Sequence, residues 1–174
     1  ATKGGITLSG GEVLMQPKFA SRILKGAKEL GVHTAVDTSG FLGANASDEF
    51  LADVDLVLLD VKSGDPEIYR QVTGRDLAPT LDFGRRLSDL GIETWIRFVQ
   101  VPGYTDFDDN VAPIVEYAAS LPCVSRVEIL PFHQMGREKW AEAGMKYELD
   151  HVEPPTNERT EHVREMFRAV GLTT

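Results

Sequence analysis

The chain has 174 residues, 42% of them hydrophobic, which is enough to bury a sizeable core in one globular domain. Its formal net charge of -9 argues against the clustered Lys and Arg surface on which nucleic-acid binding depends. No apolar run approaches the roughly 20 residues of a membrane span, and the N-terminus lacks the order of a signal peptide. These features predict a cytoplasmic protein with neither nucleic acid nor membrane as a partner.

Strands and helices are predicted to alternate along the first third of the chain. A short apolar strand leads into Ser9-Gly10-Gly11-Glu12, and Pro17 then stands at the first position of a helix that ends at Gly31. A second strand, Val32 to Val36, runs into Asp37-Thr38. Two glycines and a carboxylate at the end of an apolar run are typical of a strand that delivers a polar group to the rim of a barrel.

The third strand is the clearest in the sequence. Residues 55–62 form a nearly continuous apolar run, which predicts a parallel strand buried on both faces. Before it, a short helix is expected to begin at Ser47 or Asp48. After it, Asp65 and Pro66 read as the N-cap and first residue of another short helix that ends near Gly74.

The second half of the chain repeats the same alternation. The periodicity predicts helices over residues 80–90 and 109–120, strands over 93–101 and 126–131, and a last helix capped by Thr156. Alternating strands and helices imply βαβ units, so we expect an α/β fold, a partial barrel of parallel strands within a single domain that spans residues 1–174.

Ligands of parallel sheets bind at the carboxyl ends of the strands. The residues predicted there are polar and include both charge signs: Glu12, Asp37, Asp60, Lys62, Arg97 and His133. A rim that combines carboxylates with Lys, Arg and His suits a zwitterionic ligand with an ammonium and a carboxylate group.

Several stretches in this order resemble the radical S-adenosylmethionine (SAM) enzymes that activate glycyl radical enzymes, and most closely the pyruvate formate-lyase activating enzymes. The resemblance covers essentially the whole chain. The matching stretches are Ser9-Gly10-Gly11-Glu12-Val13-Leu14-Met15-Gln16, Asp37-Thr38-Ser39-Gly40-Phe41, Leu58-Leu59-Asp60-Val61-Lys62, Trp95-Ile96-Arg97-Phe98-Val99 and Leu130-Pro131-Phe132-His133-Gln134-Met135-Gly136.

The resemblance implies a role for each matching residue. Gly10, Gly11 and Glu12 correspond to the motif that binds the SAM amino group, and Asp60, Val61 and Lys62 to the segment that contacts the methionine moiety. The Lys62 ammonium is expected to pair with the carboxylate of SAM.

Four further positions correspond to parts of the family's site. His133 resembles the histidine that reaches the ribose hydroxyls, and Asp37 an acid that lines the same pocket. Asp37, Thr38 and Asp60 match positions that coordinate a monovalent cation. Arg97 matches a catalytic arginine at the rim where the partner's glycine loop enters.

The same residues also allow purely structural roles. Asp37 and Asp60 could be strand-end carboxylates that cap a helix or pair with Lys62, and Arg97 could simply neutralise one of them. The segment Asp106-Phe107-Asp108-Asp109 reads as a solvated loop and helix start. His33, His151 and His162 match no motif and are expected at the surface.

The chain departs from the family at one point. Radical SAM activators carry a Cys-x-x-x-Cys-x-x-Cys motif that binds a [4Fe-4S] cluster, whereas Cys123 is the single cysteine here and is expected to be a small buried hydrophobe. The cluster-ligand cysteines are therefore absent from this chain. We expect that an N-terminal piece with the first strand and the cluster ligands is missing, that the C-terminus is complete, and that these residues alone are inactive.

Three functions stay open at this stage. The favoured one is the SAM-binding portion of an activator of pyruvate formate-lyase, with the cluster, and an electron donor such as flavodoxin or ferredoxin, acting only in the full-length protein. The second is an activator of another glycyl radical enzyme, such as a glycerol dehydratase. The third is an α/β binding domain without a cluster or redox activity.

Overall fold

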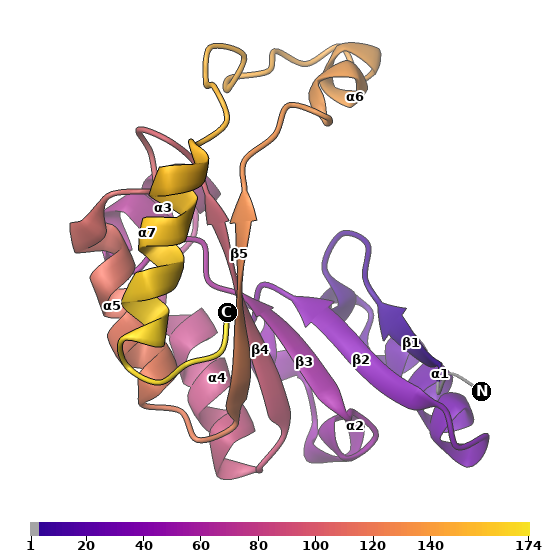
Figure 1. The fold of residues 1–174 in the computed structure, drawn as a ribbon. Helices are drawn as coiled ribbons and strands as arrows, with labels where there is room; N and C mark the ends of the chain where they lie inside the picture. Colours follow the sequence, from indigo (N-terminus) through magenta and orange to yellow (C-terminus); the bar gives the residue numbers. More distant parts are fainter. Residues whose placement is uncertain (1–3) are drawn as a thin grey trace.

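The computed structural model describes residues 4–174. Within this range the strands form one parallel sheet in the order β1-β2-β3-β4-β5, so that neighbours in sequence are neighbours in the sheet (Figure 1). This confirms the predicted α/β class and the partial (β/α) barrel. The strands are β1 (Gly5–Leu8), β2 (His33–Thr38), β3 (Leu56–Asp60), β4 (Glu93–Gln100) and β5 (Val124–Pro131).

Four helices begin at the positions predicted from their first residues or capping residues. Pro17 opens the first α-helix, and the side chains of Ser47, Asp65 and Thr156 each accept a backbone N–H at a helix start. Three short helices, η1, η2 and α6, were not predicted. The helices are η1 (Val13–Met15), α1 (Pro17–Glu29), η2 (Gly43–Asn45), α2 (Asp48–Ala52), α3 (Pro66–Thr73), α4 (Ala78–Asp89), α5 (Asp108–Ala119), α6 (Arg137–Glu142) and α7 (Asn157–Arg168).

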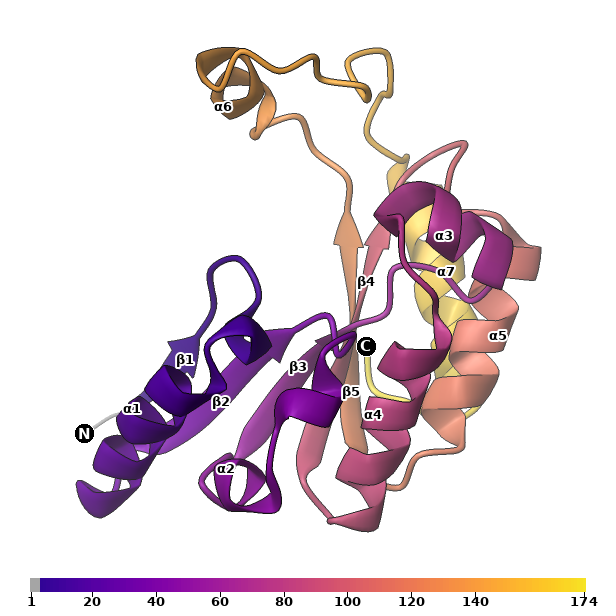
Figure 2. The same cartoon turned by 180° about the vertical axis from the view of Figure 1, so that it is seen from behind.

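The helices cover one face of the sheet. Figure 2 shows α1, α2 and α4 in front of the strands, whereas the strands face the viewer in Figure 1. In β3 the side chains of Val57 and Leu59 are buried, while those of Leu56 and Leu58 on the other face are only half-buried. The prediction that this strand is buried on both faces is therefore wrong, because no helix of the described chain covers the second face.

The hydrophobic core lies between the sheet and these helices. It includes fully buried side chains from the strands and from all parts of the helical layer, among them Leu14, Leu24, Leu51, Leu59, Leu87, Ile96, Phe98, Ile114 and Phe167. Cys123 packs against this core as a small hydrophobe, but it is only half-buried and not fully buried as predicted. Among residues 4–174, no helix is both long enough and apolar enough to cross a membrane.

The strand register gathers polar residues on the open face of the sheet. Arg97 in β4 lies opposite Asp60 in β3 and opposite Glu128 in β5, and Asp37 in β2 lies opposite Leu58. Since side chains alternate between the two faces of a strand, these charged residues all point away from the helices. The carboxyl ends of β2 to β5 therefore carry a charged surface.

Candidate functional site

The loop after β1 is fastened to the end of β2 by one carboxylate. Glu12 accepts hydrogen bonds from Thr38 Oγ1 at 2.6 Å, from Ser39 N at 3.0 Å and from Ser39 Oγ at 2.6 Å. It also accepts the N–H of Leu14 at 3.1 Å, which caps η1. Gly10 allows the chain to turn into this loop, because its φ of 130° lies in a region that side chains other than glycine rarely adopt.

Glu12 thus lies at the predicted rim, but its bonding differs from the prediction. A carboxylate offers about four acceptor positions, and here the chain's own donors occupy that number. In this geometry the carboxylate first holds two loops together and contributes negative charge to the rim. An ammonium group of a ligand would have to share these oxygens with Thr38 and Ser39.

A chain of ion pairs runs across the open face from β2 to the end of β3. Arg97 lies between two carboxylates, with its Nη1 2.9 Å from Asp37 Oδ1 and its Nε 3.8 Å from Asp60 Oδ1. The other oxygen of Asp60 accepts a hydrogen bond of 2.6 Å from Lys62 Nζ. Ser9 Oγ completes the row by donating to Asp37 at 3.0 Å.

This arrangement matches the structural alternative for Arg97, Asp37 and Asp60 as well as the functional one. Arg97 pairs with Asp37 and lies 3.8 Å from both Asp60 and Glu128, so a single guanidinium faces three carboxylates. Asp60 Oδ1 and Arg97 Nε are both buried and have no hydrogen-bond partner among the described residues. Buried polar atoms without partners are rare in proteins, and a bound ligand, ion or water is one explanation for them.

A cavity of about 510 Å³ lies beside this row of charges, which is within the usual size range of ligand pockets. Glu12 and Lys62 line the same cavity, together with Ser39 and Tyr69. Burial raises the pKa of Tyr69, whose hydroxyl shares a hydrogen bond of 2.9 Å with Thr80. The remaining lining residues are Met15, Phe41, Leu42, Thr73 and Arg75.

The structure treats the other predicted site residues differently. Val61 has a buried side chain, and its N–H donates to Arg97 O at 3.0 Å, so its role in the fold is to continue β3 beside β4. Gly11 lines a second cavity of about 360 Å³ next to Glu12. His133 is exposed in the loop after β5, and its Nδ1 accepts the N–H of Met135 at 3.4 Å.

Among residues 4–174, no hydrogen bond or ion pair joins His133 to the other predicted site residues. The structure therefore brings Glu12, Asp37, Thr38, Asp60, Lys62 and Arg97 together and leaves His133 apart from them.

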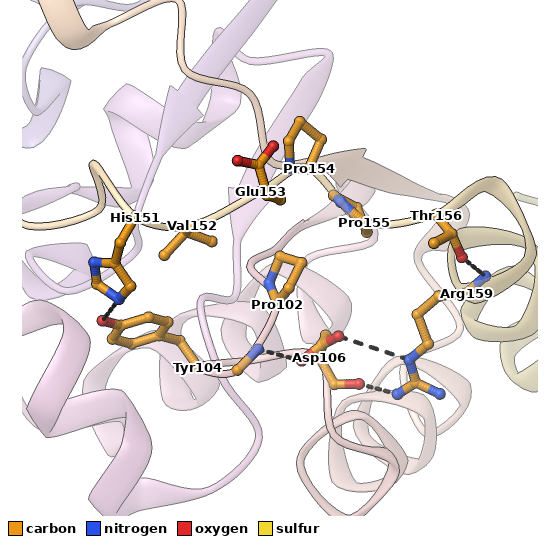
Figure 3. Close-up of a pocket in the computed structure, with 11 residues that line it drawn as sticks. Pro102, Tyr104, Asp106, His151, Val152, Glu153, Pro154, Pro155, Thr156 and Arg159 are labelled. Atoms are coloured by element: carbon orange, nitrogen blue, oxygen red, sulfur yellow. Dashed lines mark hydrogen bonds and ion pairs between the residues drawn. The ribbon is translucent and has the colours of Figure 1, made fainter.

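A larger cavity of about 690 Å³ lies elsewhere, between the β4–α5 loop and the segment before α7. Figure 3 shows Tyr104 bonded to His151 on one side of it and Asp106 facing Arg159 on the other. The side chain of Asp106 is 15% exposed and accepts the N–H of Gly103 at 2.9 Å. The prediction of a solvated loop is therefore wrong for Asp106, because its carboxylate is held by the protein itself.

Two functional features were missed from the sequence. Tyr69 lines the cavity, and Asn110 binds the loop that follows Lys62. Asn110 was predicted only as part of a helix start, because a single asparagine after two aspartates carries no recognisable signal. Its partners in that loop lie 45 to 47 positions away along the chain.

The residues present do not fit an iron-sulfur cluster. Such a cluster needs three or four thiolates, and the sequence contains Cys123 alone, which packs against the core. Nor does the described part of the chain contain a group of three or more His, Cys, Asp or Glu residues that could hold a metal ion. The monovalent cation at Asp37, Thr38 and Asp60 stays a prediction, and in the structure the Arg97 guanidinium lies between the two aspartates.

Comparison with known proteins places this geometry in a family. Residues 1–117 match the family model of the radical SAM superfamily. The pyruvate formate-lyase 1-activating enzyme of Escherichia coli K12 is 37% identical over 173 residues, which cover 98% of this chain and 70% of that protein. The chain belongs to the pyruvate formate-lyase-activating enzymes of the radical SAM superfamily.

Further similarities agree with this membership. The pyruvate formate-lyase-activating enzyme of Streptococcus mutans is 41% identical over 170 residues, covering 94% of this chain and 65% of that protein. A crystallised domain of the corresponding enzyme from Bacteroides vulgatus superposes with a TM-score of 0.80 at 26% identity, covering 98% of this chain and 96% of that one. The resemblance stated from the motifs is thereby confirmed.

Proposed function

We propose that the chain carries the SAM-binding portion of a pyruvate formate-lyase-activating enzyme, which generates a glycyl radical on its partner by reductive cleavage of SAM. The observation that carries this proposal is the cavity lined by both Glu12 and Lys62. A pocket with a carboxylate at one side and an ammonium at the other complements the amino acid end of SAM, which bears the opposite charges in the same molecule. Family membership supplies the reaction class.

The residues of this chain bind and orient the ligand. The Lys62 ammonium pairs with the ligand carboxylate and is then shared between that carboxylate and Asp60. Glu12 and the backbone at Gly10 and Gly11 accept hydrogen bonds from the ligand ammonium. Arg97 offsets part of the negative charge of Asp37 and Asp60 at the rim, where the partner's loop is expected to enter. SAM supplies, when bound, the 5'-deoxyadenosyl group that abstracts hydrogen, and the protein provides position and exclusion of water.

The remaining parts of the function are extensions of this proposal. The partner is a glycyl radical enzyme, pyruvate formate-lyase, and the location is cytoplasmic. Flavodoxin or ferredoxin as electron donor and a monovalent cation near the SAM carboxylate belong to the same proposal. No step through a cluster is derived for these residues, because they offer one thiolate.

Calorimetric titration with SAM tests the binding proposal directly. Lys62→Ala should weaken SAM binding by about tenfold or more, because a charge-assisted hydrogen bond contributes roughly 1.5–3 kcal/mol. Lys25→Ala removes an exposed lysine from α1 and serves as the matched control, with unchanged binding. Equal heats for the wild-type chain and Lys62→Ala would remove Lys62 from the site.

A second candidate, an α/β binding domain without a cluster, is favoured by the single cysteine. Both candidates predict that this chain alone holds no cluster, and they differ in whether the intact protein carries a cysteine triad, which its full sequence decides. Reconstitution with iron and sulfide under anaerobic conditions tests the shared prediction. We expect the isolated chain to show no iron-sulfur absorbance and still to bind SAM. Absorbance of a bound cluster would contradict the expectation that this chain alone lacks one.

A further inference from the structure

A buried asparagine in the first turn of α5 organises the loop that follows Lys62. Asn110 is 1% exposed, and its Oδ1 accepts hydrogen bonds from Ser63 Oγ at 2.5 Å and from the N–H groups of Gly64 and Asp65 at 3.0 Å each. Three donors on consecutive residues thus converge on one side-chain oxygen. The backbone directly after Lys62 is fixed by a residue almost 50 positions away.

The loop is shaped to receive this side chain. Ser63 is fully buried, and while its hydroxyl proton is directed at Asn110, its Oγ accepts the N–H of Asp65 at 3.1 Å. Gly64 lies so close to α5 that an added Cβ would be 2.5 Å from the backbone carbonyl oxygen of Asn110. A side chain at this position would push the loop away from the helix. The contact between loop and helix therefore depends on Gly64 as well as on the amide of Asn110.

The other end of the same amide holds the loop after β4. Asn110 Nδ2 donates to Thr105 O at 2.6 Å, and Thr105 Oγ1 in turn donates to Val99 O at 3.0 Å and accepts the N–H of Val101 at 3.0 Å. One side chain thereby clamps the carboxyl ends of β3 and β4 to each other. Lys62 and Thr105 also line a common cavity of about 200 Å³, so the clamp borders the lysine itself.

We propose that Asn110 is a positioning residue for Lys62, which sets where the lysine ammonium meets the carboxylate of the ligand. This inference rests on the proposed SAM-binding function. A lysine side chain has four flexible carbons, so its ammonium is placed accurately only if its backbone is held. The amide of Asn110 holds that backbone on the loop side and ties it to β4 on the other side. Misplacement by about 1 Å at a binding group can cost a large factor in function.

Binding of a ligand that lacks the carboxylate distinguishes the positioning role of Asn110 from a purely structural role. Decarboxylated SAM retains the sulfonium, the adenosine and the amino group, but offers nothing to Lys62. We expect Asn110→Ala to weaken SAM binding by about tenfold and decarboxylated SAM binding by less than about twofold. In a Lys62→Ala background, Asn110→Ala should change SAM binding no further, because the two residues act through the same contact.

Two more variants keep the test decisive. Ser63→Ala removes one of the donors to Asn110 and leaves the helix intact, so it should produce the same ligand-dependent pattern with a smaller loss if Asn110→Ala folds poorly. Asn157→Ala, at an exposed asparagine in the first turn of α7, is the matched control and should bind both ligands normally.

Equal losses for both ligands, or additive effects of Asn110→Ala and Lys62→Ala, would overturn the positioning role and leave SAM binding in place. A wild-type chain that binds neither ligand would overturn this inference together with the proposed function. Unchanged SAM binding in both Asn110→Ala and Ser63→Ala would overturn the inference alone.

Discussion

Two regions of the molecule carry predicted ligand-binding residues but differ in how firmly these are held. The first region consists of the loops after β1 and β2, and the second is the segment after β5. In the first region Glu12, Thr38 and Ser39 are joined by hydrogen bonds of 2.6–3.0 Å. In the second, His133 is exposed, α6 buries no residue, and Met135, Trp140 and Met145 are largely exposed. In Figure 1 this segment extends away from the sheet.

The difference separates two kinds of binding surface. The first region has its groups placed before a ligand arrives, so binding costs little ordering there. The second has few contacts of its own, and its residues must be ordered when something binds. Substitutions in the first region should therefore change stability as well as binding, and those in the second should change binding alone.

The largest expected effect is at Glu12. Glu12→Ala leaves Thr38 Oγ1 and the donors of Ser39 without their acceptor, and it should lower the free energy of unfolding by about 3 kcal/mol. Urea denaturation measures this loss. Glu29→Ala, at an exposed glutamate near the end of α1, should stay within about 0.5 kcal/mol of wild type. Equal stability of the two variants would mean that the first region is not held together as described.

A smaller loss is expected at Arg97. Arg97→Ala removes the positive charge that lies near Asp37, Asp60 and Glu128, which should destabilise the protein by about 2 kcal/mol, less than for a fully buried ion pair. Because the cluster is partly open to solvent, high salt should recover part of the loss by screening the carboxylates. A loss that is the same at low and high salt would show that repulsion is not its cause.

The next smaller loss is expected at Asp55, an ion-paired carboxylate at the opposite end of the same strands. A hydrogen bond from Lys28 at 2.5 Å, supported by bonds from Thr34, lowers the pKa of Asp55 from 3.8 to about 2. Since the folded-state pKa is depressed, the stabilisation is present above about pH 4 and is lost as the pH falls towards 2. With a discount for solvent exposure of the pair, Asp55→Asn should cost about 1 kcal/mol at neutral pH.

Unfolding curves for wild type and Asp55→Asn between neutral pH and pH 2 check this directly. The gap between the two proteins should close as the pH falls. Asp89→Asn, at an exposed aspartate that ends α4, should follow the wild-type curve throughout. A gap of constant size at all pH values would mean that the carboxylate charge is not the source of the stabilisation.

The smallest change in stability is expected at His133. His133→Ala should alter the free energy of unfolding by less than about 0.5 kcal/mol, because the side chain is exposed. Under the proposed function it should nevertheless weaken SAM binding several-fold, since a neutral hydrogen bond contributes roughly 0.5–1.5 kcal/mol. Lys25→Ala, at an exposed lysine of α1 outside both regions, is the control. A marked loss of stability would show that the second region is better packed than described.

The fold was largely predictable because its signals are local. Capping by Ser47, Asp65 and Thr156 depends on residues within one turn of a helix, and the alternation of strands and helices leaves few arrangements other than a parallel sheet. The error at β3 has a physical reason. An apolar run indicates burial in general, but it does not say whether a second layer of helices covers the other face.

The site was predictable only as a set of strand-end residues. The row from Asp37 through Arg97 to Lys62 follows from strand register, which the motif positions anticipated. The hydrogen bonds that join Glu12 to the loop after β2 and Asn110 to the loop after β3 could not be predicted from the sequence. These partners lie 26 or more positions apart along the chain. Local patterns carry no information about such long-range hydrogen bonds.

The identity of strand order and chain order has a consequence for biogenesis. Each βα unit docks on the one synthesised just before it, so no later strand has to insert between two that are already paired. The strands can therefore pair in the order in which they leave the ribosome. The loop after β3 can form its hydrogen bonds to Asn110 only after α5 has been translated.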